Sequence, residues 1–234
     1  GLLGELLQAL MSKALSSSPK VYWGPLFQTL ITQTNQKHVL FYLFDDDAQS
    51  GIEALNAAGR IRDYDGDYFH LNDTSFSGAK VNIFMQQEVE SNYEINSDGT
   101  INKTVIVNYK NPYPGSDCNL ERGGLCLNAL YKDWFRVYVP KGSKLIESKG
   151  SQVKVTTYEE LDKTVFDGFL TVRPLGKATL TLTYTLPFKM TGSSLPVLIQ
   201  KQPGTYGNKY TTKVNGNTKD TFELLTDHEL KLNK

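Results

Sequence analysis

Hydrophobic positions at the start of the chain repeat with a helical period. In residues 1–16, apolar side chains recur at steps of three and four, at Leu2, Leu3, Leu6, Leu7, Leu10, Met11, Ala14 and Leu15. This spacing predicts an amphipathic helix. A second helix is expected after Gly24 and Pro25, because proline suits the first turn of a helix. A third is expected in residues 45–59, where three aspartates favour a helix start and a glycine favours its end.

A continuous apolar run, HVLFYLF at residues 38–44, lies between the second and third expected helices. Such a run is typical of a strand that is buried on both faces. The order helix, helix, strand, helix therefore predicts that residues 1–85 are the C-terminal part of an α/β domain. The chain also starts at Gly1, inside the helical pattern, so we expect a fragment with any secretion signal or membrane anchor upstream of it.

Beyond about residue 80 the hydrophobic period changes to two. In EVESNYEI, Val89, Tyr93 and Ile95 fall on one face and acidic residues on the other, as in a half-buried strand. Asp98-Gly99 and Asn215-Gly216 are typical hairpin turns. Further strands are expected in residues 134–140, 152–158, 163–172 and 178–187.

These short strands predict an antiparallel, immunoglobulin-like β-sandwich over residues 86–234. The Cys-Trp-Cys spacing of true immunoglobulin domains is missing, so the prediction concerns architecture alone. The fold class expected for the whole chain is α+β, with a partial α/β segment followed by the sandwich.

Charge and composition exclude several partners. The chain has 25 basic and 25 acidic residues, so it shows no global electrostatic footprint for nucleic acid or for an anionic membrane. No apolar run approaches the roughly 18 residues of a membrane span, and no transmembrane segment is expected. Nucleic acid is therefore excluded as an expected partner.

The two cysteines of the chain, Cys118 and Cys126, lie in the short polar stretch CNLERGGLC. The glycines allow the loop to bend until the sulfurs meet, which favours a disulfide over free thiols. A zinc site is the least favoured alternative, because His38, His70 and His228 lie far away without ligand-like spacing. A disulfide would indicate an oxidising compartment outside the cytoplasm.

Two acidic groups resemble ligand sites but have simpler interpretations. Asp63, Asp65 and Asp67 alternate around a glycine as in a calcium loop, yet the twelve-residue pattern with its terminal glutamate is missing. We interpret them as a solvated turn before a strand and expect no metal site. Residues 45–47, three aspartates, follow the apolar run and are interpreted as the N-cap and first turn of the third helix.

No nucleophile-elbow, Walker, zinc-protease or dinucleotide motif occurs in the sequence. We therefore expect no catalytic residue and no cofactor for this chain. Lysine and asparagine on apolar strands are residue types found in pilin-style isopeptide crosslinks, but no motif in this sequence supports such a bond.

The order of several segments resembles a known bacterial family. The segments are QKHVLFYLFDDDAQSGIEALNAAGRI, DGDYFHLNDTSFSGAKVNIFMQQEVESNYEINSDG, WFRVYVPKGSKLIE, KTVFDGFLTVRPLGKATLTLTYTLP and VLIQKQPGT. Together they resemble the C-terminal part of domain-of-unknown-function family 4012, over roughly residues 1–205. Members look like cell-envelope proteins with an N-terminal membrane anchor and a domain similar to the LytR-CpsA-Psr phosphotransferases, which attach glycopolymers to the cell wall. The stretch NDTSFSGAKVN is less glycine-rich than the family pattern, and the cysteine loop looks like an insertion.

This resemblance implies a pyrophosphate-lipid site of arginines and aspartates upstream of the present chain. Arg60 and Arg62 could reach such a site, although surface solvation is the simpler interpretation. The leading hypothesis is a non-catalytic, extracytoplasmic cell-envelope module with a structural or scaffold role, whose partners are a cell-wall glycopolymer or other envelope proteins. The alternatives are part of a glycopolymer (lipid-pyrophosphate) phosphotransferase, and a self-associating surface-layer or fibre subunit.

Overall fold

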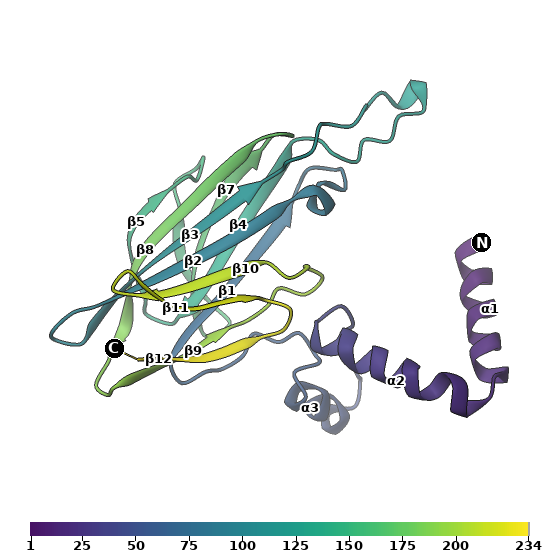
Figure 1. Ribbon diagram of the computed structural model, residues 1–234, viewed down its shortest axis with the longest axis horizontal. Coiled ribbons are helices and arrows are strands. Elements are labelled where there is room, and N and C mark those ends of the chain that lie inside the picture. Colours follow the sequence, from purple (N-terminus) through teal and green to yellow (C-terminus); the bar gives the residue numbers. More distant parts are fainter. Residues whose placement is uncertain (234) are drawn as a thin grey trace. The chain divides into compact units, whose positions relative to one another are not determined.

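The computed structural model describes residues 1–233 of the chain (Figure 1). Internal contacts divide the chain into a helical unit, Gly1–Arg60, and a β unit that begins at Ile61. This division precedes the boundary between residues 85 and 86 that the sequence analysis placed. The strand expected at Tyr68 is the first strand of the β unit.

The helical unit contains α1 (Leu2–Ser16), α2 (Pro19–Asn35) and α3 (Asp46–Ala54). All three expected helices are therefore present. Pro25 was expected in the first turn of α2, but the helix starts six residues earlier and Pro25 lies inside it. The capping interpretation is confirmed, because the side chain of Asp45 accepts a hydrogen bond of 2.9 Å from the backbone N–H of Ala48.

The buried strand expected in residues 38–44 is wrong. This segment is irregular, and its side chains include Tyr42 at 71% and Phe44 at 95% exposure. A strand buried on both faces needs neighbouring strands to satisfy its backbone, and no strand is described within residues 1–60. The interpretation of this unit as the end of an α/β domain is corrected accordingly.

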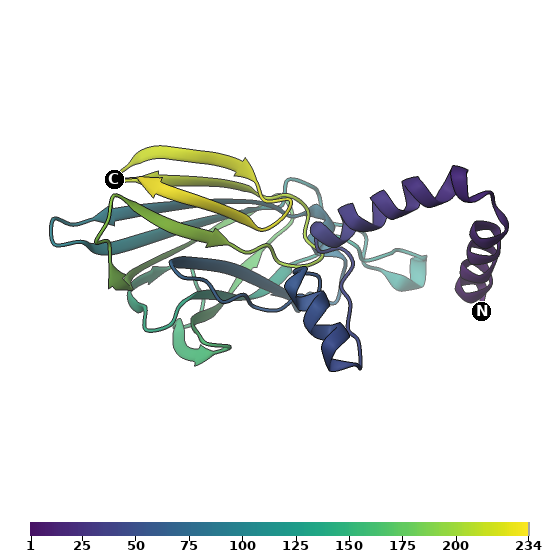
Figure 2. The ribbon, with the colours of Figure 1, turned by 90° about the horizontal axis from the view of Figure 1, so that it is seen from below.

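The β unit contains twelve strands in its described residues. They are β1 (Asp67–Ser75), β2 (Gln86–Ile95), β3 (Thr100–Lys110), β4 (Tyr131–Pro140), β5 (Lys144–Lys149), β6 (Thr156–Glu160), β7 (Lys163–Val172), β8 (Lys177–Lys189), β9 (Ser194–Ile199), β10 (Lys209–Val214), β11 (Asn217–Glu223) and β12 (His228–Asn233). The first sheet has the order β12-β9-β1-β4-β7-β6 and the second sheet has the order β11-β10-β2-β3-β8-β5. Figure 2 shows the strands of this unit as two layers.

Both sheets are mixed, which corrects the prediction of an antiparallel, immunoglobulin-like sandwich. β1 pairs with β9 in parallel, and β2 pairs with β10 in parallel. Strands account for 43% and helices for 20% of the structure, so it is mostly β. An alternating sequence shows which side chains of a strand face the core. It does not show whether the strands after residue 190 run parallel or antiparallel to the strands beside them.

The core of the β unit lies between the two sheets. Phe166 of β7 packs against Tyr184 of β8 with ring centroids 5.3 Å apart, and Phe69 of β1 packs against Tyr210 of β10 at 6.4 Å. The outer face of the first sheet carries a second apolar cluster: Tyr68, Tyr138, Val165 and Leu198, with Ile61 and Tyr64 packed on it. β1 is consequently buried on both faces along its first half.

The loop between β3 and β4 carries the disulfide Cys118–Cys126, which confirms the favoured pairing. This loop extends from one end of the β unit and includes a short 3-10 turn, Leu120–Arg122 (Figure 1). The bond closes a local loop on one side of the sheets, so it stabilises the loop and not the junction between the sheets.

Within residues 1–233, none of the helices has both the length and the apolar character of a membrane span.

Candidate functional site

A pocket of about 240 Å³ opens between the ends of the two sheets. We call it the polar pocket, and its lining residues are Asp73, Asn82, Ile83, Met85, Gln87, Tyr109, Tyr131, Gln202, Gly204, Thr205, Tyr206 and Asn208. They come from β1 and β4 of the first sheet, from β2 and β3 of the second, from the segment before β2, and from the loop between β9 and β10. The pocket therefore forms only when the two sheets pack together and the loop between β9 and β10 lies against their ends.

Asp73 of β1 is held in place from several directions. Its Oδ1 accepts a hydrogen bond of 2.8 Å from the hydroxyl of Tyr109, and its Oδ2 accepts one of 2.6 Å from Nε2 of Gln87. The side chain of Gln202 forms two bonds of 2.9 Å with the backbone of Asp73: its Oε1 accepts from the N–H and its Nε2 donates to the carbonyl. Asn208 donates to Oε1 of Gln87, which ties the loop after β9 to the pocket wall.

Asp73 faces a second carboxyl group, that of Asp133. In the pairing of β1 with β4, Asp73 lies opposite Phe135 and Ser75 lies opposite Asp133, so the two aspartates are diagonal neighbours on the same inward face. Burial raises the pKa of Asp133, and the negative charge of Asp73 raises it further. Burial also raises the pKa of Asp73, against the hydrogen bonds from Gln87 and Tyr109 that favour its ionised form.

The carboxyl group of Asp133 therefore keeps its proton at neutral pH, because burial and the neighbouring charge of Asp73 both oppose its ionisation. Burial, followed by the charges of these aspartates, also raises the pKa of Tyr109 and of Tyr131, so both phenols stay protonated. The pocket thus presents amide groups, phenol hydroxyls and the carboxyl group of Asp73. This set can exchange hydrogen bonds with a hydroxyl-rich ligand.

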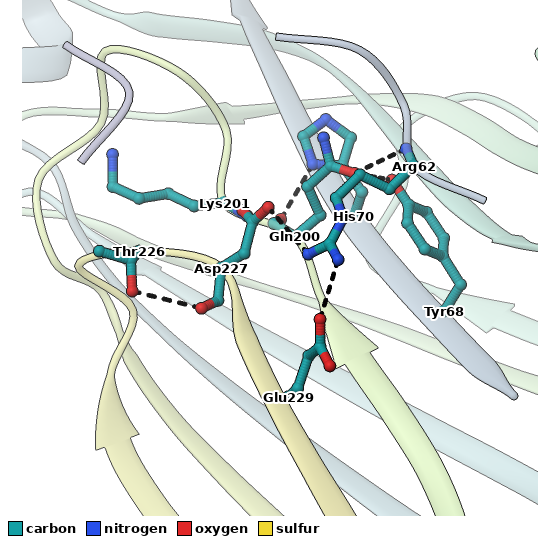
Figure 3. Close-up of polar contacts among 8 residues, drawn as sticks. All are labelled: Arg62, Tyr68, His70, Gln200, Lys201, Thr226, Asp227 and Glu229. Atoms are coloured by element: carbon teal, nitrogen blue, oxygen red, sulfur yellow. Dashed lines mark hydrogen bonds and ion pairs between the residues drawn. The ribbon is translucent and has the colours of Figure 1, made fainter. Parts of the chain in front are cut away.

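A second polar group, the Arg62 cluster, lies on the outer face of the first sheet (Figure 3). Nη2 of Arg62 is 2.9 Å from Oε1 of Glu229, and Nη1 is 3.6 Å from Oδ2 of Asp227. The backbone N–H of Arg62 donates to Oε1 of Gln200 at 3.0 Å, and the hydroxyl of Tyr68 donates to the same oxygen at 2.8 Å. These five residues, with His70, define the cluster.

The Arg62 cluster joins three segments that are far apart in the chain. Nδ1 of His70 lies 3.0 Å from the carbonyl oxygen of Gln200, and the backbone N–H of Lys201 donates to Oδ1 of Asp227 at 2.8 Å. The segment before β1, the end of β9 and the start of β12 are thereby connected (Figure 3). The guanidinium of Arg62 faces two carboxylates, which favours a structural role over the binding of an anion.

The two arginines that the sequence analysis considered together, Arg60 and Arg62, belong to different units of the chain. Arg60 belongs to the helical unit, where its guanidinium is 2.7 Å from Glu53 and its side chain is 63% exposed. Arg62 belongs to the β unit.

The three aspartates of the weak calcium candidate do not converge on one centre. Asp67 is fully buried and paired with Lys103, whereas Asp63 and Asp65 are exposed. Among the described residues, no group of three or more histidine, cysteine, aspartate or glutamate side chains is placed to hold a metal ion.

Sequence reasoning missed the carboxylate pair. A signal was present, because Asp133 falls on the same period-two face of β4 as Tyr131 and Phe135, which is the face that enters the core. A carboxylate at such a position needs a partner or a proton. The partner, Asp73, is 60 residues away in the chain and is brought beside it only by strand pairing.

No protein-family model matches the sequence, and no curated protein matches it. Among solved structures, the chain is similar to a protein described as nutrient-binding from Legionella pneumophila, at 9% identity and a TM-score of 0.38, over 64% of this chain and 55% of that chain. It is also similar to an M1 zinc metallopeptidase from Deinococcus radiodurans, at 10% identity and a TM-score of 0.27, over 56% of this chain and 31% of that chain. The chain thus spans about half of the first protein and a third of the second. At such low TM-scores neither likeness carries an argument about function.

Proposed function

We propose that this chain is a non-catalytic, extracytoplasmic module of the cell envelope that binds a cell-wall glycopolymer at the polar pocket. The observation that carries the proposal is the lining of the pocket, where amides, phenols and the carboxyl group of Asp73 converge between the sheets. The resemblance to domain-of-unknown-function family 4012 is part of the same proposal, since members of that family look like envelope proteins.

The disulfide supports the extracytoplasmic assignment. Structural disulfides persist in oxidising compartments and are rare in the cytosol. The Cys118–Cys126 bond lies in an exposed loop, where a reducing environment would have access to it.

The chemistry of the polar pocket supports a neutral, hydroxyl-rich ligand. Sugars are recognised by groups that both donate and accept hydrogen bonds, together with an aromatic face that packs on the ring. Tyr206, at 75% exposure, offers such a face at the rim. Asp73 is held by Gln87, Tyr109 and Gln202, which positions it as a fixed acceptor.

The proposal is tested by sedimentation of the protein with isolated bacterial cell walls. The wild-type protein is expected to co-sediment, and Tyr206→Ala is expected to weaken binding by about tenfold through loss of the aromatic face. Tyr158→Ala is the matched control, since Tyr158 is also an exposed tyrosine and lies on β6, outside the pocket lining. Equal sedimentation of all three proteins, or none by the wild type, contradicts the proposed site.

One rival function, part of a glycopolymer phosphotransferase, is less well supported. It needs arginines that are available to a pyrophosphate, whereas Arg62 faces Glu229 and Asp227. Turnover of a lipid-pyrophosphate substrate by this chain, lost in Arg60→Ala or Arg62→Ala, would favour the rival over the binding module.

A second candidate function, self-association, has an observation in its favour. α1 has no buried residue, and its apolar side chains include Leu3 at 83%, Leu7 at 62% and Leu10 at 60% exposure. Leu3, Leu7, Leu10 and Ala14 follow the heptad spacing through which helices pair. A second copy of α1 is the proposed occupant of this face. Light scattering across a concentration series is expected to show a dimer that Leu7→Glu abolishes, and a monomer at every concentration refutes the idea.

A further inference from the structure

The strongest unexplained feature of the β unit is a lysine and an aspartate buried together between the sheets. Nζ of Lys103 on β3 lies 2.6 Å from Oδ2 of Asp67 on β1, and both side chains are 0% exposed. β1 belongs to the first sheet and β3 to the second (Figure 1), so the contact between Asp67 and Lys103 joins the two sheets. The polar pocket and the Arg62 cluster do not include either residue.

The surroundings of this pair are aromatic. Tyr93 and Tyr184 are the residues that lie opposite Lys103 on the two neighbouring strands of its sheet, and Phe69 lies on the facing strand. Nζ is 4.7 Å from the ring centroid of Tyr93, 4.9 Å from that of Phe69 and 6.0 Å from that of Tyr184. Keeping two charges apart from water in such an apolar site is costly, even when they form a pair.

The hydrogen bonds of the carboxylate are unevenly distributed. Oδ2 of Asp67 accepts from Lys103 and also from the hydroxyl of Tyr93 at 2.5 Å. Oδ1 is buried and has no hydrogen-bond partner among the described residues. A buried, unsatisfied carboxylate oxygen is a large penalty for a native fold.

We propose that Lys103 and Asp67 form an intramolecular isopeptide bond, a covalent crosslink between the two sheets. A proton first passes from the ammonium group of Lys103 to the carboxyl group of Asp67; the neutral amine nitrogen then attacks the carboxyl carbon, Cγ of Asp67, and the bond from Cγ to Oδ1 breaks. Of the three protons on the ammonium group, two leave with Oδ1 as water and one remains on the amide nitrogen. The reaction is a condensation and needs no oxidant, reductant or further reactant.

Each neighbour has a role that follows from its position. The hydroxyl of Tyr93 is placed to stabilise the negative charge that develops on Oδ2 during the attack, as an oxyanion donor does. The oxygen that leaves is the one without a partner. Burial lowers the pKa of Lys103, against the opposing effect of Asp67, which favours the neutral amine that acts as the nucleophile. The product replaces two buried charges with one neutral amide.

Intact mass spectrometry of the full chain, denatured and reduced, tests the proposal. The wild-type protein is expected to weigh one water molecule less than its sequence. A protease digest is expected to contain one branched peptide, in which the segment with Asp67 is joined to the segment with Lys103. The full sequence mass in the wild-type protein overturns the proposal, whether or not any variant folds.

Variants show whether the missing mass of one water comes from the crosslink or from another reaction. Lys103→Met is expected to restore the full mass, whereas Lys163→Met is the matched control that keeps the deficit. Lys163 is also a buried lysine over a tyrosine ring, but its carboxylate neighbour Asp63 is 96% exposed and 3.7 Å away. Tyr93→Phe is expected to leave a fraction of the protein at full mass by slowing the condensation.

A succinimide at an Asp-Gly sequence also loses one water, and the chain contains such sequences at residues 65–66, 98–99 and 167–168. The digest distinguishes the two products, because a succinimide remains in a linear peptide. A mass deficit that maps only to a linear peptide therefore overturns the proposal. The proposed glycopolymer binding is independent of this outcome.

Discussion

The buried carboxyl pair predicts how the free energy of unfolding depends on pH. Asp133 is 0% exposed, and burial together with the charge of Asp73 holds its pKa far above the value of about 3.9 that aspartate has in an unfolded chain. From about pH 4 up to the raised pKa, the folded protein holds a proton that the unfolded chain has released. Raising the pH therefore destabilises the fold throughout this window, and lowering it has the opposite effect.

The size of the effect follows from one proton. A difference of one bound proton changes the free energy of unfolding by about 1.4 kcal/mol per pH unit. Between pH 5 and pH 8 the raised pKa of Asp133 thus lowers the free energy of unfolding by up to about 4 kcal/mol. Entry of water and relaxation around Asp73 reduce this value. Asp133→Asn has nearly the same shape and does not titrate. As the pH rises from 5 to 8, the free energy of unfolding of Asp133→Asn is expected to increase relative to that of the wild type by up to about 4 kcal/mol.

Urea unfolding of both proteins at pH 5, 6, 7 and 8, followed by circular dichroism with the disulfide intact, measures this difference. Comparing the two pH profiles cancels any effect of the substitution that does not depend on pH. Asp162→Asn serves as the control, since Asp162 is exposed and its hydrogen bond from Lys141 lowers its pKa. Parallel profiles for the wild type and Asp133→Asn would refute the reasoning, because they would mean that Asp133 ionises normally in the fold.

Two further predictions concern the stability of the β unit. Arg62→Ala is expected to lower the free energy of unfolding by about 1 kcal/mol, since its ion pair with Glu229 is partly exposed, and chemical denaturation that shows no loss contradicts its structural role. Gly150→Ala is expected to destabilise the protein by more than about 3 kcal/mol, because an added Cβ would overlap the backbone carbonyl oxygen of Thr179 at a φ of +91°. Gly123→Ala, with a φ of +77° and no atom within 4 Å of the added Cβ, is expected to cost only about 1 kcal/mol. Similar melting temperatures for the two glycine variants would contradict the argument from close contact.

Much of the local structure could be predicted because it depends on neighbouring residues. The leucine spacing of α1 and the aspartate cap of α3 are local, and both predicted helices are present. The alternation in residues 163–172 predicted β7 with the bounds that the structure shows. The Asn215-Gly216 turn also follows local rules, since both residues adopt the positive φ angles that a tight hairpin turn requires.

The site could not be predicted in the same way, because its members are distant in the chain. Asp73 and Asp133 are neighbours only because β1 pairs with β4, and the pocket beside Asp73 needs Gln202 and Asn208 from the loop between β9 and β10. The residue types were visible in the sequence, but their proximity was not.

The sequence by itself determined the helices, most of the strands, the inward faces of those strands and the proximity of the two cysteines. These features depend on hydrophobic period and on contacts between residues a few positions apart. Tertiary structure alone decided that β9 and β10 join the sheets in parallel, and that the apolar run at residues 38–44 is not a strand. It also decided that Asp67 faces Lys103 across the core and not solvent. The physical reason is that the partner of a strand or of a buried charge is chosen by packing, which joins residues that no local pattern connects.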